Sequence, residues 1–250
     1  MPPAGAGPDP AAAEVEDAGC ERCGSAERLL LRRCPPWAWQ RCSRCGHVYL
    51  APRPPARAHA RLLRAALSER VPEIEAAERR EAPARRRWIE ELRAGCPAGA
   101  RVLEIGSRFG FLLADLRAAE FDAAGIEPSP IGCRFAERWL GVRPECVQAE
   151  EWEGPAGAFD VVLADEALER VCDLERVLTL ARAWLRPSGR ILVRWRVPLP
   201  AAADAPLRRR AFTTRTLDEA LRAHGFADVD TQEDAWWKAA RSGWTCARRP

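Results

Sequence analysis

The feature that most constrains the fold is the stretch 101–113, RVLEIGSRFGFLL. It begins as a short apolar run that contains a single acid, Glu104, and it breaks at Gly106 and again at Gly110. Beyond the second glycine, apolar residues recur at helical spacing. The pattern predicts a buried strand, a tight glycine turn and a helix, in that order. Such a unit brings backbone N–H groups and a helix N-terminus to one point, which suits a nucleotide-like ligand.

Strand and helix patterns alternate beyond residue 99, and this alternation predicts a parallel sheet with helices on both faces. The strand candidates are 101–105, 122–126, 143–147, 159–164 and 190–197. The helix candidates between them lie near 110–119, 130–140 and 173–185. A helix near 215–224 and strands near 226–231 and 243–248 follow, and Trp236 and Trp237 between these strands are either a substrate lid or a core edge.

Two C-x-x-C knuckles precede this region and together predict a structural zinc site. Eighteen residues separate the knuckles and a glycine follows each one, a spacing found in four-cysteine zinc sites. Four thiolates complete a tetrahedron and leave no position for water, so the site is expected to be structural. Cys34 and His47 rank well below the knuckle cysteines as ligands. The four expected ligands are Cys20, Cys23, Cys42 and Cys45.

Composition divides the chain into four segments. The first is rich in Pro, Ala and Gly without an apolar run, which predicts a disordered tail and not a signal peptide. No apolar run reaches the ~18 residues of a membrane span, and the cysteine usage suits a reducing cytoplasm. The predicted segments are the tail (1–18), a zinc ribbon (19–52), a helical linker (53–98, with helix patterns at 56–69, 72–82 and 84–94) and a ligand-binding domain (99–250).

Glycine spacing separates two classes of nucleotide-like ligand. A dinucleotide fingerprint, G-x-G-x-x-G, would need glycine where the chain has Arg108 and Phe111. The alternative is an acid two residues before the first glycine and another glycine four residues after it. Glu104, Gly106 and Gly110 fit this second pattern.

These residues resemble the class I S-adenosylmethionine-dependent methyltransferases. The segment 104–110, EIGSRFG, resembles their first motif, E/D-x-G-x-G-x-G, and 125–129, GIEPS, resembles their second. A C-x-x-C ribbon ahead of the domain also recurs in that family. The resemblance implies an α/β fold with a Rossmann-like sheet, mostly parallel with an antiparallel last strand, behind a small zinc ribbon and a helical linker. Later segments that are also similar are 159–164 with 168–171, 185–193 and 223–226.

The resemblance further implies where S-adenosylmethionine would bind. Glu127 lies twenty-one residues after Gly106, at the end of the second strand, where its carboxylate can accept from both ribose hydroxyls. The adenine edge is expected just after the third strand, at Ala149 and Glu150. The expected cofactor-binding residues are Glu104, Gly106, Ser107, Gly110, Glu127, Ala149, Glu150 and Asp165.

The acceptor side departs from the family's pattern. Arg108 replaces the middle glycine of the first motif, and its side chain either points to solvent or reaches the methionine carboxylate of the cofactor. Arg170 replaces a common histidine. Arg194 and Arg196 share one face of the fifth strand and are expected to hold a phosphate or carboxylate of the acceptor. The candidate catalytic bases are Asp165, Glu166 and His224.

Three functions remain open. The first is methyl transfer to a small molecule, such as a sugar or a secondary-metabolite precursor. The second is an RNA or protein methyltransferase that binds its substrate through the basic ribbon, although the net charge is only +3 and no Arg/aromatic stripe lies beyond the ribbon. The third is a non-catalytic binding module with a degenerate cofactor loop, as Arg108 and Arg170 would suggest. The oligomeric state is not predicted.

Overall fold

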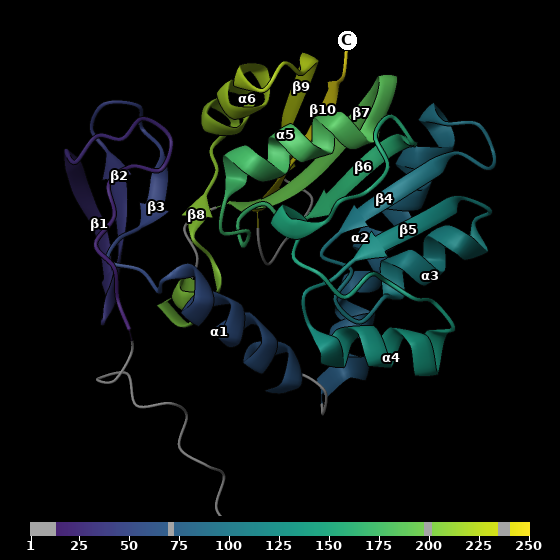
Figure 1. The fold of residues 1–250 in the computed structure, drawn as a ribbon, viewed down its shortest axis with the longest axis horizontal. Coiled ribbons are helices and arrows are strands. Elements are labelled where there is room, and N and C mark those ends of the chain that lie inside the picture. The colour runs from purple at the N-terminus through teal and green to yellow at the C-terminus, as the bar shows by residue number, and fades with distance from the viewer. Residues whose placement is uncertain (1–13, 70–72, 198–201, 235–240) are drawn as a thin grey trace, which may run out of the picture.

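The computed structural model describes residues 14–69, 73–197, 202–234 and 241–250. These residues form a small N-terminal sheet and a larger sheet with helices on both faces (Figure 1). The predicted lid or core-edge residues, Trp236 and Trp237, lie outside the described residues.

The larger sheet confirms the α/β fold class. Its strand order is β5-β4-β6-β7-β10-β9. The first four strands are parallel, whereas β10 runs antiparallel to both β7 and β9. The strands are β4 (Arg101–Ile105), β5 (Asp122–Ile126), β6 (Phe159–Asp165), β7 (Leu185–Val197), β9 (Ala227–Asp234) and β10 (Arg241–Arg248).

Alternate side chains of these strands pack against two different helical layers. Leu103 and Ile105 join the core beneath α5 and α6, whereas Val102 joins the core beneath α2, α3 and α4. Because strand side chains alternate, Glu104 lies on the same face as Val102. The helices are α2 (Ile74–Gly95), α3 (Phe111–Ala118), α4 (Pro130–Leu140), α5 (Leu174–Trp184) and α6 (Thr214–Ala223).

The expected strand at 143–147 is not a strand. Only Glu145 pairs there, through a single parallel bridge to Ile126. Pro144 has no N–H to donate to a ladder, which limits pairing at its position. The bridge still fixes the end of β5, because the Glu127 N–H donates to the Glu145 carbonyl at 2.9 Å.

The linker also differs from the prediction in one respect. Helices were expected at 72–82 and 84–94 with a break at Pro83, yet α2 runs continuously through this proline. Trp88 and Leu92 on α2 are fully buried in the core, so packing outweighs the missing N–H of one proline. The preceding helix, α1 (Ala56–Glu69), has the predicted bounds.

The N-terminal sheet includes a strand from far along the chain. It contains β1 (Arg28–Cys34), β2 (Trp37–Cys42), β3 (Val48–Leu50) and β8 (Arg210–Ala211), in that order. β8 lies between a short helix, η4 (Ala202–Leu207), and α6, and it pairs antiparallel with β3. The sheet that contains the ribbon strands is therefore completed by a segment that leads into α6.

The end of the predicted tail is ordered in the described part of the chain. Glu16 forms an antiparallel bridge with Arg53. The Arg53 N–H donates to the Glu16 carbonyl at 3.0 Å, and the Glu16 N–H donates to the Arg53 carbonyl at 2.8 Å. The Arg53 guanidinium also donates to the Glu16 carboxylate at 2.9 Å. Across the described ranges, no helix combines the length and the apolar character needed to cross a bilayer.

Candidate active site

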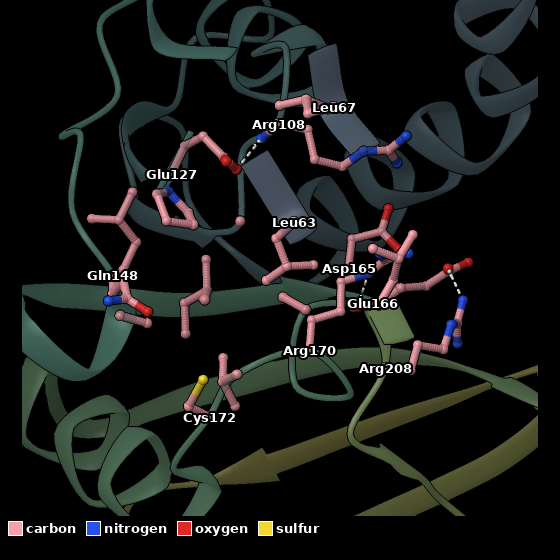
Figure 2. Close-up of a pocket in the computed structure, with 18 of the residues that line it drawn as sticks. Leu63, Leu67, Arg108, Glu127, Gln148, Asp165, Glu166, Arg170, Cys172 and Arg208 are labelled. Carbon is pink, nitrogen blue, oxygen red and sulfur yellow. Dashed lines mark hydrogen bonds and ion pairs between the residues drawn. The ribbon is translucent and has the colours of Figure 1, made fainter. Parts of the chain in front are cut away.

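A cavity of about 380 Å³ lies at the C-terminal ends of β4, β5 and β6 (Figure 2). The chain passes from β4 outward to β5 and then back to β6 on the other side of β4, so this edge is a topological switch point. Leu63 and Leu67 of α1 supply an apolar part of the wall. The volume falls within the range of roughly 300–1,000 Å³ that is typical of small-molecule sites.

Glu127 is held in a fixed position in this cavity. Its Oε1 accepts from the Ser129 N–H and its Oε2 from the Arg108 N–H, both at 2.8 Å. Burial raises the pKa of Glu127 to about 7, although these two N–H groups oppose the shift. Each carboxylate oxygen keeps a second lone pair, so the group can still accept from the two hydroxyls of a ribose.

Arg108 fits the glycine position through its backbone. Its φ of 55° lies in the left-handed region, which explains why glycine suits this position. The side chain points away from Glu127 (Figure 2), and one guanidinium nitrogen lies 3.9 Å from a carboxylate oxygen of Glu81. The guanidinium therefore leaves the Glu127 end of the cavity open.

The two motif glycines have different roles. Gly106 lines the cavity, and a Cβ added to it would lie 3.2 Å from the Cβ of Ala167. Gly110 is absent from the cavity lining, and its Cβ would lie 2.6 Å from that of Ala136 on α4. Gly110 remains a predicted cofactor-binding residue, and the structure also gives it a packing role, because it lets α3 approach α4 closely.

A second cavity, of about 50 Å³, adjoins the first at Gly106 and Arg108. Ser107 and Glu104 line it, together with Arg85 of α2. Burial, reinforced by the charges of Asp165 and Glu127, raises the pKa of Glu104 to about 8. Among the described residues, the Glu104 Oε2 has no hydrogen-bond partner.

The residues expected at the adenine edge line the first cavity, but one of them is engaged elsewhere. The Glu150 carboxylate accepts from the N–H groups of Cys172 and Asp173, at 2.5 and 3.2 Å, just before α5. Ala149 and Gln148 line the cavity beside it. Ala149 is thus left as the expected adenine contact with its backbone and small side chain.

The two acids after β6 are held by arginines. Asp165 accepts from the Arg194 guanidinium and, at 3.2 Å, from the Trp88 indole. Glu166 accepts from Arg196 at 3.0 Å and from Arg208 at 2.8 Å. Burial alone would raise the pKa of Glu166, but the charges of Arg194, Arg196 and Arg208 hold it well below its usual range. Such a carboxylate accepts a proton poorly at neutral pH.

Two residues expected on the acceptor side, Arg194 and His224, do not line the cavity. Arg194 is 5% exposed and contacts Asp165 and Glu81, the latter at 3.4 Å, so its charge is already compensated inside the protein. His224 ends α6, where its ring nitrogens lie 2.8 Å from the Ala220 carbonyl and 3.0 Å from the Glu175 carboxylate. These contacts account for His224 as the end of α6.

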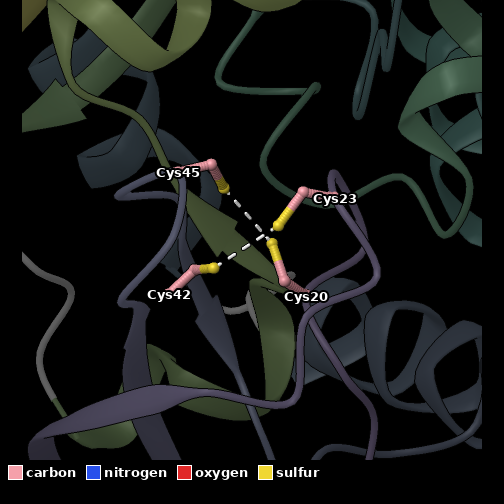
Figure 3. Close-up of side chains that lie close together, drawn as sticks. All are labelled: Cys20, Cys23, Cys42 and Cys45. Carbon is pink, nitrogen blue, oxygen red and sulfur yellow. Dashed lines mark hydrogen bonds between the residues drawn. The ribbon is translucent and has the colours of Figure 1, made fainter.

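The four knuckle cysteines converge on one point (Figure 3). Their sulfur atoms all lie within 4.8 Å of one another, and the Cys20–Cys45 and Cys23–Cys42 pairs are each 3.5 Å apart. A tetrahedral zinc ion with bonds of about 2.3 Å separates its sulfurs by roughly 3.8 Å, so the set fits this ion. His47 instead binds Glu21 at 3.0 Å and Cys34 packs with a different cluster, so neither joins the group.

Comparison with known proteins assigns the family. A family described as a methyltransferase domain matches residues 76–231. The chain belongs to the class I S-adenosylmethionine-dependent methyltransferases. The structure of this methyltransferase is also similar to a crystal structure of the 1,6-didemethyltoxoflavin-N1-methyltransferase of Burkholderia thailandensis. That structure contains bound 1,6-didemethyltoxoflavin and S-adenosylhomocysteine. The TM-score is 0.64 at 24% identity over 90% of this chain and 99% of that one, which shows a shared fold.

Curated relatives match this methyltransferase-family chain over a shorter length. The ubiquinone biosynthesis O-methyltransferase of Bordetella avium is 34% identical over 113 residues, which are 43% of this chain and 46% of the relative. The corresponding protein of Bradyrhizobium diazoefficiens is 33% identical over 103 residues, 39% of this chain and 40% of the relative. The chain thus spans less than half the length of these relatives.

Sequence reasoning missed part of the cavity wall, which includes Arg208. Arg208 is buried and bonds to the carboxylates of Glu166 and Glu169, at 2.8 and 2.6 Å. Burial raises the pKa of Glu169 to about 7. The only sequence signal was the run Arg208–Arg210 before α6, whose three arginines are all buried.

Proposed function

We propose that this protein transfers a methyl group from S-adenosylmethionine to a small-molecule acceptor. The fixed carboxylate of Glu127, beside the close-packed Gly106 at the mouth of the parallel sheet, carries the proposal. When bound, the cofactor supplies an activated methyl group on a sulfonium. The protein's own contribution is to bind, align and exclude water.

Three groups of the chain would hold the cofactor. Glu127 would accept from the ribose hydroxyls, and Ala149 would contact the adenine edge. Glu104, whose Oε2 lacks a partner among the described residues, would accept from the amino-acid end of the cofactor through the smaller cavity. Ser107 lines that cavity as well.

Alignment is the main catalytic means that this site offers. Methyl transfer is an in-line displacement, for which holding the two reactants in line contributes most of the acceleration. Glu166 stays ionised among its arginines and Asp165 is bonded to Arg194 and Trp88, so both position the arginine cluster. The apolar residues of α1 then exclude water from the reacting atoms.

A small acceptor suits a cavity of about 380 Å³ better than a polymer does. Two of the six ribbon arginines form ion pairs, Arg22 with Glu219 at 2.5 Å and Arg28 with Asp17 at 2.8 Å. These ion pairs compensate positive charge that nucleic acid would need. The names of the relatives, which refer to ubiquinone biosynthesis and to 1,6-didemethyltoxoflavin, also favour small molecules.

We also propose that Cys20, Cys23, Cys42 and Cys45 bind one structural zinc ion. Their sulfurs converge within 4.8 Å and none of these cysteines forms a disulfide. With all four positions of a tetrahedron filled by thiolates, the ion would stabilise the ribbon without contacting substrate.

Titration of S-adenosylhomocysteine by calorimetry tests the proposed function. Glu127→Ala removes both hydroxyl acceptors and should weaken binding by about 10- to 100-fold, since hydrogen bonds to charged groups contribute ~1.5–3 kcal/mol. Glu153→Ala is the matched control, because Glu153 is exposed and does not line the cavity. If the unaltered protein gives no binding heat and no thermal protection, the chain is a non-catalytic module and the proposal fails.

A further inference from the structure

Arg170 differs from the other arginines that line the cavity. Its Nε donates to the Glu166 carbonyl oxygen at 3.3 Å. Within the described ranges, no carboxylate forms an ion pair with its guanidinium. Arg196 and Arg208, by contrast, each contact the Glu166 carboxylate.

The surroundings do not compensate the Arg170 charge at short range. Glu166 and Glu169 influence it electrostatically, but both oxygens of Glu166 and the Oε1 of Glu169 accept from Arg196 and Arg208. The Glu169 Oε2 has no hydrogen-bond partner among the described residues, and it forms no ion pair with Arg170. Burial is the largest influence and lowers the pKa of Arg170 to about 10. A partly buried guanidinium without an ion-pair partner is costly to the folded protein, and a bound anion would offset that cost.

The position of Arg170 separates it from the cofactor end. Glu127 and Gln148 lie on one side of the cavity, and Glu166 and Arg208 lie on the other, with Arg170 between the two sides (Figure 2). Apolar residues line the same cavity around the arginine, from α1, from the segment before α5 and from η4. They are Leu63, Leu67, Val171 and Leu207.

We infer that the methyl acceptor carries a carboxylate or phosphate group that binds the Arg170 guanidinium, with its apolar body against α1. A guanidinium presents a planar fork of donors that matches the oxygens of either anion. Arg196, whose side chain is 40% exposed, lines the same cavity but is paired with Glu166 at 3.0 Å. The inference rests on the proposed function, because it assigns the acceptor of the same site.

Anion binding to the protein saturated with S-adenosylhomocysteine tests the inference. The probes are benzoate, phenyl phosphate and the neutral benzamide, each titrated by calorimetry. At least one of the two anions should bind more tightly than benzamide, and the stronger one identifies the acceptor's group as carboxylate or phosphate. Arg170→Gln should weaken that anion by about 10- to 100-fold, and Arg170→Lys by less, because lysine keeps the charge but loses the fork.

Arg143→Gln is the matched control, because Arg143 is 79% exposed and lies outside the cavity lining. It should leave anion binding unchanged. S-adenosylhomocysteine binding is measured first for every variant, and its absence from the unaltered protein would reject the proposed function itself.

Two results with the S-adenosylhomocysteine complex would overturn the inference alone. One is that both anions bind no more tightly than benzamide. The other is that the preferred anion binds equally to the unaltered protein and to Arg170→Gln. If Arg170→Gln does not fold, the same comparison is made with Arg170→Lys, and equal binding there, without loss of affinity, overturns the inference.

Discussion

Glu104 and Glu127 show how burial changes the chemistry of single residues. Both carboxyls have raised pKa values, about 8 and about 7, because they are removed from water at the ends of adjacent strands. Glu127 has two backbone donors that partly compensate its charge, whereas the Glu104 Oε2 has none among the described residues. Near neutral pH, Glu104 is therefore the more protonated of the two.

The raised pKa of Glu104 predicts a pH-dependent stability. In the unfolded chain this carboxyl ionises near its ordinary value of 4.5, whereas in the folded protein it stays protonated up to about 8. The folded state then binds more protons across this window, so its stability falls as the pH rises from about 4.5 to about 8. Glu104→Gln, which stays neutral, should remove this loss.

Thermal unfolding at pH 5 and pH 8.5 measures the effect. Relative to the unaltered protein, Glu104→Gln should gain at least about 1 kcal/mol at the higher pH, or roughly 2–4 °C in midpoint. The exposed Glu153 provides the control, as Glu153→Gln should show no such gain. Parallel pH profiles for the unaltered protein and Glu104→Gln would contradict the shifted pKa.

At the scale of elements, the sequence predicted most strands and helices because their periodicities are strong and their ends carry turn signals. β4, β5, α1 and α4 have the predicted bounds. The errors arose where a proline's local effect had to be weighed against distant packing. Pro144 reduced a predicted strand to one bridge, whereas Pro83 failed to break α2, whose Trp88 is fully buried.

Pro83 also predicts a simple stability change for α2. It is exposed in the helix interior, where it lacks the N–H that would complete the backbone ladder. Pro83→Ala restores that donor without opening a cavity, so it should stabilise the protein by about 1–3 kcal/mol. The measurement is chemical denaturation, with Pro97→Ala as a control at an exposed proline outside the helix. Equal or lower stability of Pro83→Ala would show that α2 depends on the proline.

At the scale of the whole molecule, Arg210 of β8 connects the ribbon to the segment beside the cavity. Glu21, within the first cysteine knuckle, contacts Arg210 of β8 at 3.1 Å. Arg210 also donates to the carbonyls of Leu168 and Val171, at 2.6 and 2.8 Å, in the segment that contains Arg170. Arg208, two residues before it, holds Glu166.

The candidate site itself was only partly predictable for this reason. Glu127 and the cysteines follow from local motifs, whose spacing is visible in the sequence. The acceptor wall is the side of the cavity that includes Glu166, Arg170 and Arg208. It depends on hydrogen bonds from Arg208 and Arg210 to segments about forty residues earlier, and on the contact of Arg210 with Glu21 far upstream. No local pattern encodes such pairings, so arginines that compensate acids could not be distinguished from arginines that bind substrate.

Removal of the proposed zinc should therefore loosen the acceptor wall. Chelation should release one zinc ion per chain, measured by elemental analysis, and should raise amide hydrogen exchange in β8 and in 166–171. Exchange in β5 should change little, because no contact of the ribbon with that strand is described. Zinc-free protein with unchanged exchange in β8 would contradict the coupling, and the absence of zinc from purified protein would reject the metal site.

The pairing of β3 with β8 has a consequence for synthesis on the ribosome. Val48 and Tyr49 leave the exit tunnel long before their partners, Ala211 and Arg210, have been translated. Until then the growing chain would expose an unpaired edge of β3. The Glu21 carboxylate would also lack the guanidinium of Arg210. The ribbon can therefore begin to fold first, but its sheet can be completed only after residues 210 and 211 have emerged.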